Sequence, residues 1–116
     1  MAKILTLKKQ KDFQQLYQKG KVFGNRNLVI YYLKNGKDTN RLGIVVSKKI
    51  SNRAVVRNKL RRRIKEAYRQ NEAGFSQGYD LILIAKASCK DADYKTIEKS
   101  LGHLFYKQRL LRRNHG

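Results

Sequence analysis

The sequence has no long hydrophobic run and only one cysteine among its 116 residues. No segment approaches the roughly 18 consecutive apolar residues that a membrane-spanning helix needs. The first residues, MAKILTLKKQK, also lack the apolar core of a signal peptide. Cys89 alone cannot form an internal disulfide, which is compatible with a reducing compartment. These absences give no reason to place the chain outside the cytoplasm, so we expect a cytoplasmic protein.

Acidic residues are also scarce. The sequence contains 8 Asp and Glu residues against 28 Lys and Arg residues, which gives a formal net charge of +20. Self-repulsion on that scale destabilises a compact chain unless a partner neutralises it, so the charge predicts a polyanionic partner. Nucleic acid, an anionic membrane surface and an acidic protein are the candidates. The membrane is the weakest of them, because no apolar span is present.

A strongly charged chain can instead be disordered, since few apolar residues leave too little surface to bury. Here 41% of the residues are apolar, and they recur in patterned blocks, which favours a folded protein. A length of 116 residues suits one modest core. We therefore expect a single domain over residues 1–116.

The first half of the sequence predicts a helix followed by strands. The segment KDFQQLYQKG places three apolar side chains on one helical face, and Gly20 is a stop signal. The β-branched and aromatic run at 27–33 and the apolar run at 41–47 flank an Asn-Gly turn signal, which predicts an antiparallel hairpin. Residues 21–25 can add a short strand.

The second half predicts a helix, a buried strand and another helix. Apolar residues from about 55 to 71 recur at i, i+4, i+7 and i+8, forming one stripe surrounded by Arg and Lys. The continuous apolar run at 79–85 suits a strand buried on both faces and paired in parallel with the strand before the helix. Asp93 can cap the last helix, whose basic end we expect to fray into the tail. This order predicts an α+β sandwich in which helices cover a small sheet.

The helix at 55–71 lies in the most basic stretch of the chain. Between residues 53 and 69, eight Lys and Arg stand against one acid, Glu66, a local net charge of +7. Leu60 and Ile64 define the core side of the helix. The basic residues beside that side are Arg57, Arg61 and Lys65, and those farther from it are Lys59, Arg62 and Arg69. An ordinary solvated helix surface mixes signs, and only Glu66 is available here, so the pattern favours contact with nucleic acid.

The loop before this helix adds small polar groups. In SKKISN, we expect one of Ser47, Ser51 and Asn52 to cap the helix. Backbone N–H groups at the helix start attract phosphate oxygens. An Arg side chain can donate two hydrogen bonds to one phosphate, and Asn58 can donate and accept toward a ribose or a base edge.

Aromatic residues form a second candidate surface. Phe13 and Tyr17 lie on the first predicted helix, and Tyr31 shares strand parity with Val29, with Tyr32 on the opposite face. Rings on an uncovered face can stack splayed bases, as in readers of single-stranded RNA. Aromatic residues at these spacings are also ordinary core residues, so both interpretations stay open at this point.

Protein-based catalysis finds little support in the sequence. His103 and His115 have no Cys or carboxylate at metal-ligand spacing. Asp91 and Asp93 are close in sequence, but they fall in a predicted loop and a helix cap. Cys89 is typical of a small loop residue, and neither a GxxxxGK phosphate loop nor a zinc-finger spacing occurs. We expect no catalytic residue, no metal site and no small-molecule cofactor in this chain.

The stretch RLGIVVSKKISNRAVVRNKLRRRIKEAYR resembles the signature region of the protein subunit of bacterial ribonuclease P, the ribonucleoprotein that removes the 5′ leader from precursor tRNA. The resemblance covers most of the chain. KDFQQLYQKGK is similar to the family's first helix, LVIYYL and DLILIAK to its second and fourth strands, and SLGHLFYK to its last helix. It implies an α-β-β-β-α-β-α sandwich with a left-handed βαβ crossover, whereas the general rule predicts a right-handed one.

The resemblance also implies where RNA binds. In this family the catalytic centre belongs to a large RNA that uses metal ions, so Mg²⁺ is expected as a cofactor bound mainly by the partner RNA. An Arg-Asn-Arg signature contacts that RNA, and a cleft between the first helix and the sheet takes the single-stranded leader. The resemblance assigns contact with the catalytic RNA to Lys48, Lys49, Arg53, Arg57, Asn58, Lys59, Arg61, Arg62, Lys65 and Arg69. It assigns contact with the leader to Phe13, Tyr17, Val29 and Tyr31.

Two features depart from the family pattern. Lys59 stands where the signature most often has Arg, so a bidentate contact becomes a point charge. Ser51 stands where a glycine is common, and the loop looks one residue longer than usual before Arg57. The resemblance therefore does not fix the conformation of this loop or the roles of Ser51, Asn52 and Arg53.

We expect the protein cofactor of a tRNA-maturing ribonucleoprotein, a non-catalytic subunit whose partners are the catalytic RNA and precursor tRNA. A ribosomal-type protein clamped on structured RNA would use the same basic helix without a leader cleft. A protein-only metal nuclease would cut without added RNA and depend on Asp91 or Asp93. A DNA-binding regulator would need base-reading side chains backed by a dimer or a second helix, and the sequence shows neither.

Overall fold

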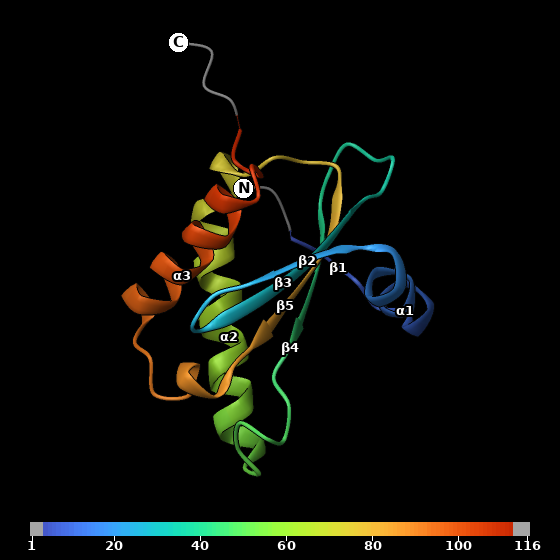
Figure 1. The fold of residues 1–116 in the computed structure, drawn as a ribbon. Coiled ribbons are helices and arrows are strands. Elements are labelled where there is room, and N and C mark those ends of the chain that lie inside the picture. The colour runs from blue at the N-terminus through green and yellow to red at the C-terminus, as the bar shows by residue number, and fades with distance from the viewer. Residues whose placement is uncertain (1–3, 113–116) are drawn as a thin grey trace.

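A computed structural model describes residues 4–112 and places them in an α+β fold (Figure 1). In chain order the elements are β1 (Leu5–Thr6), α1 (Gln10–Lys19), β2 (Lys21–Gly24), β3 (Leu28–Lys34), β4 (Arg41–Val45), α2 (Ala54–Asn71), the 3-10 turn η1 (Glu72–Gly74), β5 (Tyr79–Ala85), the 3-10 turn η2 (Ala87–Cys89) and α3 (Tyr94–Lys107). The predicted α+β class, its three helices and the short strand near residues 21–25 are confirmed.

The centre of the sheet is β5. The strands are ordered β1-β4-β5-β3-β2, and β5 pairs in parallel with β4 and antiparallel with β3. Leu81, Ile82 and Leu83 are 0% exposed, as expected for a strand buried on both faces. The predicted parallel pairing of the strands on either side of α2 is confirmed. The handedness of that crossover stays a prediction from the resemblance.

The predicted antiparallel hairpin between residues 27–33 and 41–47 is wrong. β3 and β4 lie on opposite sides of β5 and do not pair with each other. The turn signal itself is correct, because Gly36 has a φ of 72° and Asn35 Oδ1 accepts from the Lys37 N–H at 2.8 Å. A turn fixes only the local reversal of the chain. Here β5 takes the position between the two strands, where its apolar side chains are buried on both faces.

β1 is an edge strand that the sequence did not predict. Its two residues pair in parallel with Arg41 and Leu42, and the Leu7 N–H donates to Leu42 O at 3.0 Å. Two residues are too few to show the alternation by which a strand is recognised. In the described part of the chain, no strand pairs with this edge of β4 beyond Leu42.

The two faces of the sheet are covered unequally. The main core, which contains Ile64 of α2 and Phe105 of α3, lies on one face. A smaller cluster around Leu16 of α1 and Ile82 of β5 lies on the other face. Figure 1 shows α1 across the sheet from α2 and α3. The face that α1 covers alone is therefore the more open one.

Two predicted helix boundaries are confirmed, although one has a different cause. The Asp93 side chain caps α3 by accepting from the Thr96 N–H at 2.9 Å. Gly20 ends α1 with a φ of −72°, so no left-handed residue is involved. A Cβ at this position would lie 2.6 Å from Leu16 O, and glycine is therefore required by close approach.

The expected fraying after α3 is wrong for residues 108–112. The chain reverses at Arg109, whose φ is 58°, and the Leu110 N–H donates to Phe105 O at 2.8 Å. Leu110 is 2% exposed, so its burial holds this segment against the core. His115 lies outside the described residues.

Candidate nucleic-acid interface

α2 turns one apolar stripe toward the core, and the charged side chains on the rest of its surface are mostly basic. The stripe consists of Leu60, Ile64, Ala67 and Tyr68, which are buried as predicted. The predicted contact residues that are exposed are Lys48, Lys49, Arg53, Asn58, Lys59, Arg62 and Lys65. The predicted contact residues that are half-buried are Arg57, Arg61 and Arg69.

One flank of α2 forms a continuous basic ridge, which we define as Arg57, Asn58, Arg61, Arg62 and Lys65. Residues four positions apart lie one above the other on a helix, so these five form two adjacent rows. Asn58 Oδ1 accepts from Arg61 Nη1 at 2.7 Å and joins the two rows. The ridge presents guanidinium, ammonium and amide groups on one side of the helix.

The opposite flank of α2 carries Lys59 and Arg63 and contacts the segment before α3. Lys59 projects there, because consecutive helical residues are about 100° apart. Arg63 lies on the same flank, and its Nη1 donates to Ala92 O at 2.9 Å, which ties α2 to the segment before α3. The three residues 57–59 that match the family signature therefore cannot all face one flat surface.

Arg69 is paired within the protein. Its Nε and Nη2 donate to Glu66 Oε1 and Oε2 at 3.0 and 2.6 Å. The hydrogen bond from Arg69, with a second from Gln70, lowers the pKa of Glu66 to about 2. Glu66 therefore stays ionised at neutral pH and offsets the charge of Arg69. Within residues 4–112, no ion pair with a carboxylate involves the ridge residues Arg57, Arg61, Arg62 and Lys65.

The predicted cap of α2 by Ser47, Ser51 or Asn52 is wrong. The N-cap residue is Arg53, whose side chain makes no capping hydrogen bond. Ser51 Oγ accepts from the Arg53 N–H at 3.2 Å, which is too early in the chain to satisfy the first helical turn. Arg57 Nη1 donates to Ser51 O at 3.0 Å and holds this loop against the helix. The first-turn N–H groups, which the Arg53 side chain does not cap, can bind an outside anion.

α1 and β3 bring the predicted aromatic residues together in a surface that we call the aromatic face, defined as Phe13, Tyr17, Val29 and Tyr31. The rings of Tyr17 and Tyr31 meet edge to face with centroids 4.9 Å apart. Tyr17 is 43% exposed, and the other three residues are half-buried. Tyr32 is buried on the opposite face of the sheet, as its parity predicts. Phe13 and Tyr31 therefore pack against the smaller core, while Tyr17 presents ring surface to solvent.

Gly43 of β4 determines where Phe13 lies. A Cβ at position 43 would be 2.7 Å from two atoms of the Phe13 ring and 3.5 Å from Leu7. The ring therefore rests directly on the β4 backbone, where any side chain would displace it. This contact seats α1 on the sheet.

The basic ridge and the aromatic face meet in one cavity. Its volume is about 190 Å³, and it is lined by Phe13, by Arg61 and Lys65, and by Gly43 and Ile44 of β4. It lies beside the edge of β4 that β1 leaves unpaired. An RNA strand that crosses this edge can place a phosphate against the ridge and a base against the aromatic face.

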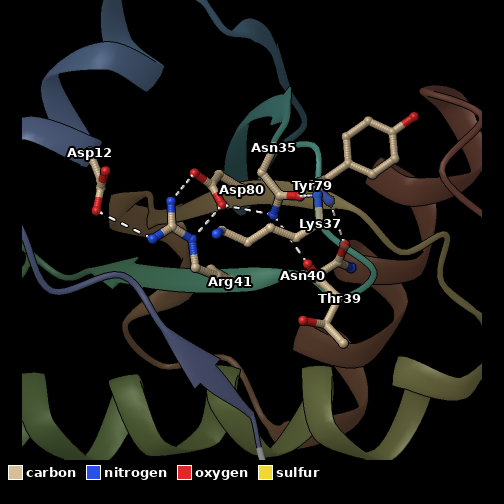
Figure 2. Close-up of polar contacts among 8 residues, drawn as sticks. All are labelled: Asp12, Asn35, Lys37, Thr39, Asn40, Arg41, Tyr79 and Asp80. Atoms are coloured by element: carbon tan, nitrogen blue, oxygen red, sulfur yellow. Dashed lines mark hydrogen bonds and ion pairs between the residues drawn. The ribbon is translucent and has the colours of Figure 1, made fainter.

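A polar network fixes α1 to the sheet near this surface (Figure 2). Arg41 Nε and Nη2 donate to the two Asp80 carboxylate oxygens at 2.8 and 2.6 Å, and Nη1 donates to Asp12 Oδ2 at 3.5 Å. Asn35 Nδ2 donates to Asp80 Oδ1 at 3.0 Å. Burial alone would raise the pKa of Asp80, but the bonds from Arg41 and Asn35 outweigh it and lower this pKa. Sequence reasoning missed the network because its members come from four separate segments.

The residues named for catalytic alternatives are not gathered into a site. Asp93 caps α3, and Asp91 is exposed before it. Cys89 is buried, which raises the pKa of its thiol. His103 Nδ1 lies 3.2 Å from Asn25 Nδ2. Within residues 4–112 no group of three His, Cys, Asp or Glu side chains could hold a metal ion, and no helix there is long and apolar enough to cross a membrane.

Comparison with known proteins identifies a family with similar sequences and structures. The family model described as Ribonuclease P matches residues 1–109. The ribonuclease P protein component of Clostridioides difficile (strain 630) is 52% identical over 99 residues, which cover 84% of this chain and 86% of that protein. The ribonuclease P protein component of Alkaliphilus metalliredigens is 44% identical over 105 residues, which cover 90% of this chain and 94% of that protein. A solved structure of the Staphylococcus aureus RNase P protein superposes with a TM-score of 0.84 at 37% identity, covering 95% of this chain and 100% of that one.

These matches span the helix that carries the basic ridge and both elements that carry the aromatic face. They agree with the resemblance read from the signature stretch, and the fold agrees with a solved member at more than 30% identity. The chain therefore belongs to the ribonuclease P protein family, whose members are protein components of a tRNA-processing ribonuclease.

Proposed function

We propose that the chain is the protein cofactor of the ribonuclease P ribonucleoprotein, which removes the 5′ leader from precursor tRNA by endonucleolytic cleavage. In this proposal the partner RNA performs the cleavage, and the protein binds that RNA and the substrate in the cytoplasm. The observation that carries it is the meeting of the basic ridge with the aromatic face at the unpaired edge of β4. One surface thus offers cations for a folded RNA and rings for an unpaired strand.

The basic ridge would contact the catalytic RNA. Its cations have no carboxylate partner within residues 4–112, so their donors can turn to phosphate. Lys48, Lys49 and Arg53 are exposed beside the start of α2 and extend the same surface. Contacts of this kind hold a phosphate backbone without reading bases, so the shape of the RNA sets the position of the protein.

The aromatic face would contact the single-stranded leader. Tyr17 presents the most ring surface, and its edge-to-face contact with Tyr31 limits how both rings can rotate. Unpaired bases stack on such rings with little dependence on sequence. A leader of any sequence can therefore be held, while mature tRNA, which has no leader, makes no contact here.

Magnesium enters this proposal as an ion bound mainly by the partner RNA. Three of the described acids are engaged within the protein: Asp80 pairs with Arg41, Asp93 caps α3 and Glu66 pairs with Arg69. The described acids as a whole form no group of three that could hold a metal ion, so we assign no step to an ion held by this chain. The contribution of the protein is to position RNA.

The test is reconstitution with each component omitted in turn. The purified protein, free of contaminating ribonuclease, is mixed with a transcribed bacterial catalytic RNA and a leader-bearing precursor tRNA at low Mg²⁺. We expect cleavage at the mature 5′ end only when protein and catalytic RNA are both present. The readout is the yield and position of the cut on a sequencing gel.

Two other outcomes would overturn the proposal. Cleavage by protein alone would place the chemistry in this chain, and the Asp91→Asn and Asp93→Asn variants would then show whether those acids take part. Tight RNA binding without any stimulation of cleavage would favour a ribosomal-type role.

A further inference from the structure

A second aromatic hollow lies on the other face of the sheet, near the end of α3. In the strand register Lys21 is opposite Tyr32, and Lys34 is opposite Tyr79, so two Lys-Tyr pairs stand side by side. α3 ends at Lys107, and the chain then turns through Gln108. Within residues 4–112, this corner of the sheet is therefore bordered by the end of the helix and only partly covered.

The hollow has a volume of about 340 Å³ and is lined by Lys21, Tyr32, Lys34, Tyr79, Gln108 and Leu110. Tyr32 donates from its hydroxyl to Gln108 Oε1 at 2.5 Å. The rings of Tyr32 and Tyr79 meet edge to face with centroids 6.1 Å apart. Tyr32 is thus fixed in place, while Tyr79 stays half-buried at the mouth. The interior is apolar, and two exposed ammonium groups stand at its rim.

A neighbouring hollow extends this surface. It measures about 500 Å³, shares Lys34 and Tyr79 with the first, and is otherwise bordered by the loops at 36–37 and 76–78. No carboxylate of the described residues lines either hollow. Figure 2 shows the Tyr79 ring directed away from the Arg41–Asp80 pair, which belongs to the α1 side of the sheet. Tyr79 therefore stands between two hollows whose charged groups are all cationic.

We propose that these joined hollows bind unpaired RNA nucleotides, with one base against Tyr79 and flanking phosphates at Lys21 and Lys34. An aromatic ring beside cations is the arrangement by which proteins hold single-stranded nucleic acid. The volume of the first hollow suits one small ligand such as a nucleotide. The Gln108 amide nitrogen can donate to a base edge while its oxygen holds Tyr32. This site lies across the sheet from the aromatic face and is independent of the proposed leader contact.

The probe is a decauridylate RNA, labelled with fluorescein for anisotropy and with 4-thiouridine for photo-crosslinking. In a Tyr17→Ala background, where the aromatic face holds the probe more weakly, we expect Tyr79→Ala to weaken binding about tenfold, as loss of one base stack implies, while Tyr79→Phe keeps the affinity of that background. The double variant Lys21→Gln, Lys34→Gln should flatten the slope of log K against log salt by about 1.4. Peptide mapping should find crosslinks at Tyr79 or Tyr32.

The matched control is Lys95→Gln, Lys99→Gln, which removes the same charge from exposed positions of α3. Its salt slope should stay closer to the parent, and circular dichroism melts should show that every variant is folded. Parental affinity and slope in the Lys21, Lys34 double variant, with no crosslink at either tyrosine, would overturn the site. Equal, Tyr79-dependent binding of a polyglutamate of the same charge would overturn the assignment to RNA.

The proposed leader contact is judged by a different variant and readout. Tyr79→Ala should keep the preference for precursor over mature tRNA, which Tyr17→Ala should lose. Loss of that preference in Tyr79→Ala alone would place the leader in this hollow and overturn the independence of the two sites.

Discussion

Phe13 and Tyr17 share one predicted helical face, but they contribute differently to the stability of the fold. Phe13 rests on the backbone of Gly43 and is half-buried, so its removal would unseat α1. Tyr17 is 43% exposed and lies at the outer side of the same helix. Tyr17 is therefore the better residue for separating binding from folding.

Tyr17→Ala should reduce the affinity for precursor tRNA about tenfold and leave the affinity for mature tRNA unchanged. The physical reason is the loss of one stacking ring from the aromatic face. Fluorescence titration of the holoenzyme with both tRNAs measures the ratio. Tyr106→Ala is the control, because Tyr106 is 68% exposed on α3. An equal loss for both tRNAs would contradict leader contact at Tyr17.

At the scale of elements, the position of α1 depends on the network around Arg41. The Asp80 side chain is 13% exposed and accepts both bonds from the Arg41 guanidinium. Asp80→Asn should lower the free energy of unfolding by about 2 kcal/mol at pH 7, because it leaves a charged donor without its carboxylate. Urea unfolding measures the difference, and Asp38→Asn in the exposed β3–β4 loop is the control.

This effect should depend on pH in a definite direction. The pKa of Asp80 is lowered in the folded protein. The carboxylate therefore stabilises the fold fully when the pH is above 3.8, the ordinary pKa of an aspartate. That contribution is lost as the pH falls through the lower folded-state pKa. The difference between the parent and Asp80→Asn should therefore shrink between pH 5 and the most acidic pH at which both fold. A difference that grows on acidification would refute the assignment.

The basic ridge is the second element-scale feature, and its charges should act through phosphate. In the double variant Arg61→Gln, Lys65→Gln, binding to the catalytic RNA should depend less on salt. The slope of log K against log salt should become less steep by about 2. Filter binding at several potassium chloride concentrations measures it. Lys95→Gln, Lys99→Gln removes equal charge from α3. A parental slope in the ridge variant would show that the ridge meets no phosphate.

At the scale of the whole molecule, a net charge of +20 is carried by only 116 residues. Salt shortens the range of repulsion from about 30 Å at 0.01 M to about 8 Å at 0.15 M. Raising potassium chloride between these concentrations should increase Tm by about 4 °C, which corresponds to about 1 kcal/mol for a chain of this length. Calorimetry measures this shift. A falling Tm would show that attractive pairs such as Arg41–Asp80 outweigh repulsion.

The helices could be predicted because their signals are local. The stripe from Leu60 to Tyr68, the cap at Asp93 and the stop at Gly20 each depend on neighbours within a few residues. The sheet order could not be predicted in this way, because the Asn35-Gly36 turn gives no information on what lies between β3 and β4. Arg41, Asp80 and Asp12 likewise stand too far apart in sequence to reveal a network.

The sequence by itself determined the α+β class, the basic helix, the buried β5 and the family, since these follow from local periodicity, composition and a contiguous signature. Only the tertiary structure decided that β5 separates β3 from β4 and that Phe13 meets Arg61 and Lys65 in one cavity. The physical reason is that the free energy of folding depends on how much apolar surface the strands and helices bury when they pack together. Such packing brings residues together that are distant in sequence, and the sequence around each of them contains no local pattern that indicates the contact.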